Sequence, residues 1–307
     1  MLKYVYGLVS DETDYYLEQA LMSITSLKIR MPDAFISLVI DDITDKTLIG
    51  KRKNVLGFVN ELKVVNIALQ FNKKIRSRWL KTSIRKHIDG NFIFIDCDTV
   101  ICDDLSHIGN LDCDLGAVLD CHILRHGSDA KIIQGNDKIL GFSASFVSDK
   151  HFNSGVIFCR DTSICHKFFD EWHGLWLSRM KSNIFIDQPS FNQANLNLNN
   201  IITEIDGIWN CQISKGGIVF LCDAKIIHYF TSLPGKNPYL LADFSLLHKI
   251  SEIGIDEEII KYLSHPKRIF SLNTRIEVRK VRDIVRDTFI NYADTFIKKI
   301  KVIFMNR

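Results

Sequence analysis

Short apolar runs alternate with amphipathic segments along most of this 307-residue chain. The runs have the length of buried strands, and the segments between them repeat apolar residues at three- and four-residue steps, the helical period. We expect strands at 3–9, 35–40, 58–67, 92–95, 115–119, 156–158, 201–204, 218–221 and 225–229. We expect helices at 15–28, 45–55, 77–88, 162–180, from 187, and from 239 to the end. This alternation predicts an α/β fold with a mainly parallel, twisted sheet and right-handed crossovers.

One of these runs, residues 92–95, ends in the acidic tripeptide Asp96-Cys97-Asp98. Side chains two residues apart on an extended chain point the same way, so both carboxylates leave the strand's carboxyl end together, where open α/β sheets bind ligands. Like charges at this distance repel unless a cation lies between them, and Mg²⁺ or Mn²⁺ is commonly held by carboxylates plus substrate phosphates. The tripeptide therefore predicts a metal–diphosphate site; the alternative is a loop with two solvated acids.

The same tripeptide occurs a second time, as Asp112-Cys113-Asp114. Here it follows Gly109, Asn110 and Leu111 and not a four-residue apolar run. Without a buried strand to aim the two carboxylates, we interpret this copy as a surface turn that does not bind metal.

The composition is that of an ordinary globular protein, with 46% hydrophobic and 24% charged residues. No apolar run approaches the roughly 18 residues that span a bilayer, and the first residues enter a strand pattern without the features of a secretory signal. The eight cysteines include no CxxC pair. These features favour reduced thiols and a cytoplasmic location.

The small net charge of +3 is unevenly distributed along the chain. Residues 271–307 hold nine Lys/Arg against four Asp/Glu, a net of +5 that leaves −2 for the rest. Apolar residues recur there at helical spacing, which predicts a basic amphipathic tail on an anionic membrane surface, at the inner face of the membrane. The alternative is a tail helix packed on the rest of the protein. Because the basic excess is confined to the tail, nucleic-acid binding has little support.

Four later segments carry polar groups of the kind that bind sugars and phosphates. They are Asn153-Ser154-Gly155 before a strand, Asp187-Gln188 before a helix, the turn 207–210, and His228-Tyr229 at the end of a strand, with Lys236 eight residues on. The polar region 122–150 reads as a long loop or lid, where we expect acceptor recognition.

The order of these segments resembles that of the retaining glycosyltransferases of family 8, over residues 3–238. The resemblance rests on the strand before Asp96 and Asp98, the Asn-Ser-Gly turn, the Asp-Gln pair and the late Ile-His-Tyr. It implies a GT-A fold, Rossmann-like, as a catalytic domain over 1–238, with 239–307 as a C-terminal helical region. It also implies metal-dependent transfer of a sugar from a UDP-sugar to a hydroxyl of a glycan or lipid-linked acceptor, such as a cell-envelope polysaccharide, with retention of configuration.

The resemblance assigns roles position by position. Asp96, Asp98 and His228 would bind the divalent metal, Mn²⁺ or Mg²⁺. The nucleotide and donor sugar would contact Val9, Ser10, Asp11, Asp41 or Asp42, Arg78, Lys81 as a weaker candidate, Cys97, Asn153, Ser154, Asp187 and Lys236. Gln188 would lie near the anomeric carbon. The interval from His228 to Lys236 is longer than is usual in the family, and Phe230-Thr231 replace its more typical glycine.

The implied chemistry is attack of the acceptor hydroxyl on the same face that the diphosphate leaves, with Gln188 stabilising the positive sugar through its carbonyl oxygen. Asp187 stays open as a nucleophile for a double displacement. Three other functions are alternatives: an inverting GT-A transferase, a nucleotidyltransferase, and a non-catalytic nucleotide-sugar-binding protein at a membrane.

Overall fold

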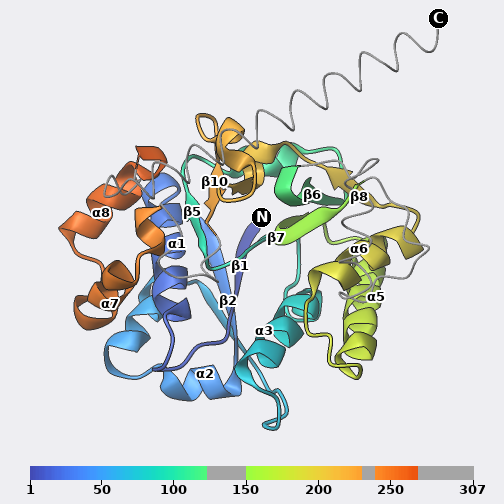
Figure 1. The fold of residues 1–307 in the computed structure, drawn as a ribbon, viewed down its shortest axis with the longest axis horizontal. Helices are drawn as coiled ribbons and strands as arrows, with labels where there is room; N and C mark the ends of the chain where they lie inside the picture. Colours follow the sequence, from blue (N-terminus) through green and yellow to red (C-terminus); the bar gives the residue numbers. More distant parts are fainter. Residues whose placement is uncertain (123–149, 230–238, 269–307) are drawn as a thin grey trace, which may run out of the picture.

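The computed structural model describes residues 1–122, 150–229 and 239–268. Its centre is a seven-stranded sheet with the order β3-β2-β1-β4-β7-β6-β8 (Figure 1). The strands are β1 (Lys3–Leu8), β2 (Phe35–Asp41), β3 (Glu61–Val65), β4 (Phe92–Ile95), β6 (Leu115–Leu119), β7 (Phe152–Cys159) and β8 (Ile202–Glu204). The pairs of β1 with β2 and β4, of β2 with β3, and of β6 with β8 are parallel. The predicted mainly parallel α/β sheet is therefore confirmed.

Strand β7 runs antiparallel to both of its neighbours, β4 and β6. Its amino end consequently lies at the same edge of the sheet as the carboxyl ends of β1, β2, β4 and β6. In register, Val156 of β7 is opposite Ile95 of β4. The reversed strand thus brings Asn153, Ser154 and Gly155 to the edge where Asp96 emerges.

Helices cover both faces of the sheet (Figure 1). They are α1 (Tyr16–Arg30), α2 (Asp42–Thr47), α3 (Lys73–Thr82), α5 (Ser163–Met180), α6 (Gln188–Asn197), α7 (Phe244–Ile253) and α8 (Glu257–Ser264). Short 3₁₀ segments connect them: η1 (Gly50–Phe58), η2 (Ile84–Lys86), η3 (Ser106–Asn110), η4 (Asp120–His122), η5 (Gly207–Asn210), η6 (Gly217–Phe220), η7 (Leu240–Ala242) and η8 (Pro266–Arg268).

Alternation along the strands divides the core into two layers. On β1, Tyr4, Tyr6 and Leu8 pack in the cluster under α1, whereas Val5 packs in the opposite cluster with the aromatic side chains of α5. The predicted aromatic stripe of the 162–180 helix therefore lies in the core, where burial of each large side chain contributes about 1.5–3 kcal/mol.

A second, three-stranded sheet has the order β5-β10-β9. It consists of β5 (Thr99–Ile101), β9 (Cys211–Gln212) and β10 (Ile226–His228), and β10 is antiparallel to β5. Helices α7 and α8 pack on this sheet and on α1 through a shared apolar cluster. The division of the chain at residue 238 stays a prediction.

Several of the expected elements differ from the structure. The helix expected at 77–88 begins earlier, as α3 (Lys73–Thr82), and is followed by the 3₁₀ segment η2. Residues 218–220 belong to the 3₁₀ segment η6, with Leu221 as its C-cap, and do not form a strand; Gly216, with a left-handed φ of 85°, precedes the segment. The helix expected at 45–55 is two pieces, α2 and η1, separated by Leu48 and Ile49, and η1 begins at Gly50, whose φ is also positive. The Asn-Ser-Gly turn expected before a strand is itself part of β7.

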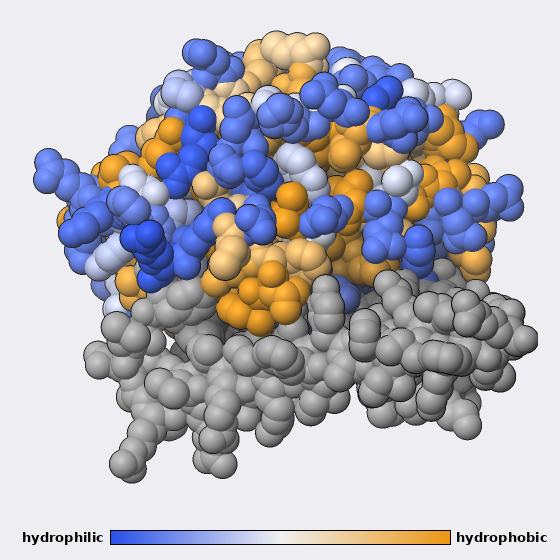
Figure 2. All heavy atoms as spheres, turned by 90° about the horizontal axis from the view of Figure 1, so that it is seen from above, coloured by the Kyte–Doolittle hydropathy of each residue, from blue (hydrophilic) through white to orange (hydrophobic). Residues whose placement is uncertain are grey.

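The predicted basic tail, Lys236 and most of the region 122–150 lie outside the described residues. In the part that is described, no helix is both long enough and apolar enough to cross a lipid bilayer. On the face in Figure 2, hydrophilic side chains surround separate apolar patches. All eight cysteines lie within the described residues, and each is a free thiol.

Candidate metal and donor site

Three acidic or imidazole side chains from different elements meet at the carboxyl edge of the large sheet. They are Asp96 and Asp98, in the turn between β4 and β5, and His228, the last residue of β10. One ligand atom from each lies within 4.8 Å of the others. His228 is 2% exposed, whereas Asp96 and Asp98 are 26% and 24% exposed, so the cluster opens toward solvent through its two acids.

The local sequence explains this convergence. All four residues of β4 are buried, which anchors Asp96 at the strand end, and its backbone N–H donates to Gly155 O at 2.8 Å. The β5–β10 register pairs His228 with Thr99, and the Tyr229 N–H donates to Asp98 O at 3.1 Å. Two strand pairings therefore fix the position of the metal-type cluster.

The two acids of the cluster have opposite electrostatic surroundings. Burial raises the pKa of Asp96, although Lys81 Nζ lies 2.8 and 3.0 Å from its two carboxylate oxygens and acts to lower it. Burial also acts to raise the pKa of Asp98, but the charge and hydrogen bond of His228 outweigh it and lower that pKa to about 2.

The donor atoms of the cluster fit a divalent cation. The His228 Nε2 atom faces Asp98 Oδ1 at 3.2 Å, while Nδ1 lies 3.0 Å from Asn210 Oδ1. When Nδ1 carries the proton toward Asn210, Nε2 and Asp98 Oδ1 are both acceptors, which repel unless a proton or a metal ion lies between them. Two carboxylates and one imidazole nitrogen suit Mn²⁺ or another first-row ion.

Asp187 lies beside this cluster and is heavily paired. Its Oδ1 is 2.9 Å from Arg78 Nε, and its Oδ2 accepts from Ser154 Oγ at 3.0 Å and lies 3.6 Å from Lys81 Nζ. Burial acts to raise its pKa, but Lys81 and Arg78 together lower it. The charge-paired Asp187 is thus held as an anion with both oxygens engaged.

Asn153 and Gln188 lie next to each other on the same side. Asn153 Nδ2 donates to Gln188 Oε1 at 3.3 Å and to Asp120 Oδ1 at 3.1 Å. Gln188 begins α6, and Asp120 directly follows β6. The edge therefore presents a row of amide and carboxylate groups of the type that bind sugar hydroxyls.

The residues predicted to border the nucleotide follow β1 and β2. Ser10 Oγ donates to Asp14 Oδ1 at 2.7 Å, and Asp11 pairs with Lys73 at 2.7 Å. Val9 is buried in the core cluster that contains the α5 aromatics. The structure brings this loop to the same sheet edge as Asp96.

The two acids after β2 have structural partners. Asp41 is fully buried, accepts from the Thr44 N–H to cap α2, and pairs with Arg76. Asp42 accepts weakly from the Ile67 N–H at 3.4 Å and pairs with Lys46 at 3.5 Å. Of the two, Asp42 is the less committed and is the better candidate for a nucleotide contact.

Cys97 points away from its acidic neighbours. Its Sγ donates to Gly7 O at 3.6 Å, and burial raises the pKa of the thiol well above its usual value. Cys97 lies between the two acids in the turn after β4, and its partly buried thiol faces the backbone of β1.

Sequence reasoning missed Asn210 and Asp120 and ranked Lys81 below Arg78. Lys81 contacts Asp96 directly and Arg78 contacts Asp187. The helical pattern of residues 73–82 shows that Arg78 and Lys81 are close on the helix surface, but it does not show which acid each one pairs with. Asn210 stands in the polar-aromatic turn 207–210, yet its contact with His228 depends on the β9–β10 pairing.

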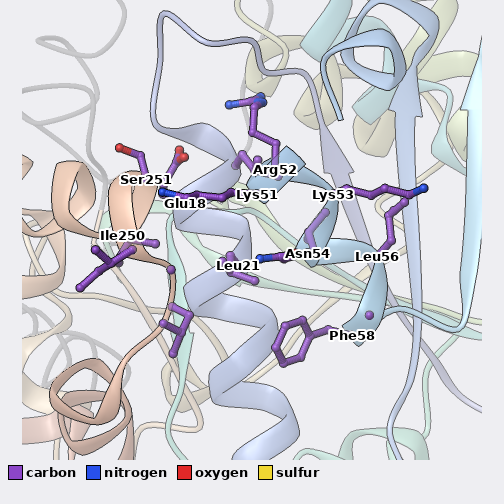
Figure 3. Close-up of a pocket in the computed structure, with 16 residues that line it drawn as sticks. Glu18, Leu21, Lys51, Arg52, Lys53, Asn54, Leu56, Phe58, Ile250 and Ser251 are labelled. Atoms are coloured by element: carbon purple, nitrogen blue, oxygen red, sulfur yellow. The ribbon is translucent and has the colours of Figure 1, made fainter. Parts of the chain in front are cut away.

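A separate groove of about 910 Å³ lies between α1, η1 and α7 (Figure 3). Lys51 extends across it toward Ser251 and Glu18, and Leu21 and Phe58 line its apolar part. Asp96, Asp98 and His228 do not line it. The groove is therefore distinct from the candidate site.

A sheet of this order with an acidic strand end, two nearby cations and an Asp-Gln pair fits the GT-A fold that the sequence predicts. The sequence model "Glycosyl transferase family 8" matches residues 8–235, more than half of the chain. The chain therefore belongs to glycosyltransferase family 8 and is a glycosyltransferase. No curated protein sequence matches it.

Solved structures agree on the fold. An active-site mutant of LgtC is 13% identical, covers 86% of this chain and 99% of its own, and has a TM-score of 0.52. GlyE of Streptococcus pneumoniae TIGR4 is 15% identical, with 89% and 67% covered and a TM-score of 0.48. Mouse xyloside xylosyltransferase 1 is 12% identical, with 74% and 97% covered and a TM-score of 0.47. At such identities the likeness concerns the fold alone, and the argument for it rests on the first.

Proposed function

We propose that this family 8 enzyme transfers a sugar from a UDP-sugar to a hydroxyl group of a glycan acceptor, with Mn²⁺ as cofactor and with retention of anomeric configuration. The single observation that carries the proposal is the cluster of Asp96, Asp98 and His228 with Lys81 and Asp187 beside it. With a divalent ion bound, such a set would offset the charge of a diphosphate on one side and present hydrogen-bonding groups to a sugar on the other.

Asp96, Asp98 and His228 would hold the ion, and a nitrogen ligand favours Mn²⁺ over Mg²⁺. When bound, the ion supplies a positive charge for the diphosphate leaving group. Arg78 and Lys81 would also stabilise the charge of the leaving diphosphate. Both lie within ion-pair distance of Asp187, and Lys81 also contacts Asp96, so they lie beside the proposed metal site. Lys236 would add a further charge from outside the described residues.

The transfer breaks the bond between the anomeric carbon and the phosphate oxygen and forms one to the acceptor oxygen. The acceptor's proton passes to the departing phosphate oxygen, so no protein base is needed. Asn153 Nδ2 lies 3.3 Å from Gln188 Oε1 and would hold that carbonyl in place to stabilise the positive sugar. Asn153 and Ser154 would bind the sugar hydroxyls.

The partners of Asp187 favour this same-face reaction over a double displacement. A carboxylate that is paired with Arg78, Ser154 and Lys81 is a weaker nucleophile, and these contacts restrict its movement toward an anomeric carbon. Its fixed negative charge instead orients the two cations. Asp187 would thus act by position and charge and not as a nucleophile.

We also propose a cytoplasmic enzyme that works on a cell-envelope or lipid-linked glycan at the inner face of the membrane. Its support is the basic amphipathic pattern of residues 271–307 in the sequence. A truncation before residue 271 that still binds anionic vesicles as the full chain does would contradict this part.

The test is UDP release from a panel of UDP-sugars by the full chain, with Mn²⁺ and with EDTA, without acceptor. We expect slow hydrolysis of one donor, abolished by EDTA. Mn²⁺-dependent UDP binding without release from any donor would favour the non-catalytic alternative. Once an acceptor is known, an inverted anomeric configuration of the product would contradict retention.

A further inference from the structure

Two buried side-chain amides connect the backbone N–H of Gly155 to the imidazole of His228. The Gly155 N–H donates to Asn153 Oδ1 at 2.9 Å, and Asn210 Nδ2 donates to the same oxygen at 2.9 Å. Asn210 Oδ1 in turn lies 3.0 Å from His228 Nδ1. Asn153, Asn210 and His228 are 3%, 0% and 2% exposed, so water does not compete for these contacts.

The direction of each hydrogen bond follows from the first. A backbone N–H is always a donor, so the oxygen of Asn153, and not its NH₂, must face Gly155. That oxygen then requires a donor from Asn210, which turns the Asn210 oxygen toward His228. An oxygen accepts only, and Nδ1 of His228 must therefore carry the imidazole proton.

We propose that this chain, the amide relay Gly155–Asn153–Asn210, sets the tautomer of His228 that can bind a metal. With the proton on Nδ1, the Nε2 lone pair faces Asp98 Oδ1 at 3.2 Å. If the side-chain amide of Asn210 were flipped, its NH₂ would donate to Nδ1, which would then carry no proton. The proton would be on Nε2 and donate to Asp98, and this hydrogen bond would exclude the ion. Asn210 is thus a positioning residue for the metal site, and the inference rests on the proposed function.

The same relay connects the metal side with the sugar side of the site. The oxygen of Asn153 is used by the relay, so its NH₂ points to Gln188 Oε1 and Asp120 Oδ1. Gly155 also fits this arrangement closely, because a Cβ there would lie 2.3 Å from His228 Cε1 and 2.9 Å from Asn153 Oδ1. Metal binding and orientation of the sugar-binding amide are therefore coupled through one buried network.

The experiment measures Mn²⁺ affinity of the full chain with UDP by electron paramagnetic resonance, independently of turnover. Asn210→Ala should weaken Mn²⁺ binding by about 10–100-fold, the usual effect of losing a partner behind a metal-bound histidine. Asn153→Ala should weaken it less, on the order of threefold to tenfold, because Asn153 acts on His228 through Asn210.

Asn210→Asp provides the decisive comparison. Both oxygens of an aspartate accept, so His228 Nδ1 keeps its proton acceptor whichever way the group turns. Mn²⁺ affinity should stay at or above the wild-type value, and adding Asn153→Ala to Asn210→Asp should have no further effect. This non-additivity distinguishes a relay from general loss of packing.

Asn195→Ala is the matched control, because Asn195 is also buried and its Oδ1 accepts from the Ile202 N–H at 2.8 Å, in a structural role. It should lower the unfolding temperature without changing Mn²⁺ affinity. Wild-type affinity in both Asn210→Ala and Asn153→Ala, or equal losses from Asn153→Ala in the wild type and in Asn210→Asp, would overturn the relay alone. A wild-type chain that does not bind Mn²⁺ would overturn the relay and the proposed function together.

Discussion

The chain contains the tripeptide Asp-Cys-Asp twice, and the two copies lie at opposite ends of their neighbouring strands. Asp96-Cys97-Asp98 follows the fully buried strand β4 and lies next to β10, whose His228 faces Asp98. Asp112-Cys113-Asp114 precedes β6, at the opposite end of a strand, and both of its acids are exposed, which confirms the predicted surface turn. The proposed metal site belongs to the copy that follows a strand's carboxyl end and has an imidazole nitrogen from a second element beside it.

The backbone around the two copies is used differently as well. The backbone of the first takes part in pairings to Gly155 and Tyr229 that hold both acids in place. In the second, Asp114 O accepts from the Arg160 N–H, which joins the turn to the end of β7. One copy is built to hold side chains toward a ligand, and the other serves to connect strands.

The largest expected effect concerns the acids themselves. Asp96→Asn and Asp98→Asn should each lower UDP release by about 10²–10³-fold, because each removes a charge that holds the diphosphate's counter-ion. Asp112→Asn and Asp114→Asn should leave the rate unchanged. Steady-state assays of all four variants check this, and an equal loss in both pairs would end the distinction between the copies.

A smaller effect on Mn²⁺ affinity is expected from adding a methyl group at the glycine beside the first copy, but not at the glycine beside the second. An added Cβ at Gly155 would collide with the His228 ring at 2.3 Å, so Gly155→Ala should weaken Mn²⁺ binding by about 10–100-fold. Gly116, beside the second copy, meets Ile205 Cγ2 at 3.0 Å and Cys113 Sγ at 3.4 Å, both ends of side chains. Gly116→Ala should lower stability only, and unchanged Mn²⁺ affinity in Gly155→Ala would disprove the packing argument.

Removing the charge of Lys81, the cation beside the first copy, should raise the affinity for Mn²⁺ and lower the turnover rate. Lys81 holds Asp96 at 2.8 Å and competes there with a metal ion. Lys81→Met should therefore tighten Mn²⁺ binding without nucleotide by about tenfold, a difference of ~1.4 kcal/mol, while lowering turnover. Lys86→Met, at an exposed ion pair with Asp170, is the control. Weaker Mn²⁺ binding in Lys81→Met would show that Lys81 does not compete for the acid.

The smallest expected effect is on stability in acid. The pKa of Asp98 is about 2 in the folded chain, below its ordinary value of 3.8. Its contribution to stability is therefore present above about pH 4 and is lost as pH falls through 2. Between these limits the metal-free wild type should lose on the order of 1–2 kcal/mol more than Asp98→Asn. Asp112→Asn should follow the wild type in urea titrations at each pH; if Asp98→Asn does so too, the His228 pairing is absent.

Much of the scaffold could be predicted from periodicity. The boundaries of β4 and β6 agree with the expected 92–95 and 115–119, because each is a short apolar run with clear breaks. The direction of β7 could not be predicted, since it depends on the path of a region without a periodic pattern. That single reversal turns an expected Asn-Ser-Gly turn into the start of a strand and brings it to Asp96.

The candidate site shows the same limit. The position of Asp96 and Asp98 at a sheet edge follows from the apolar run that ends at Ile95, although both lie in the turn after that strand, and His228 follows from the family resemblance. The partners of these residues do not, because Asn210 and Lys81 reach them from separate elements whose packing the sequence pattern does not specify. Asp41 had an appropriate position after β2, yet its burial and its pair with Arg76 could be seen only in three dimensions.

The most direct test of the central claim is the anomalous scattering of manganese in crystals of the full chain grown with Mn²⁺ and UDP. The account predicts a manganese peak bounded by Asp96, Asp98 and His228, with none near Asp112 and Asp114. Bound UDP without a peak at the first copy, or a peak at the second copy instead, would contradict it.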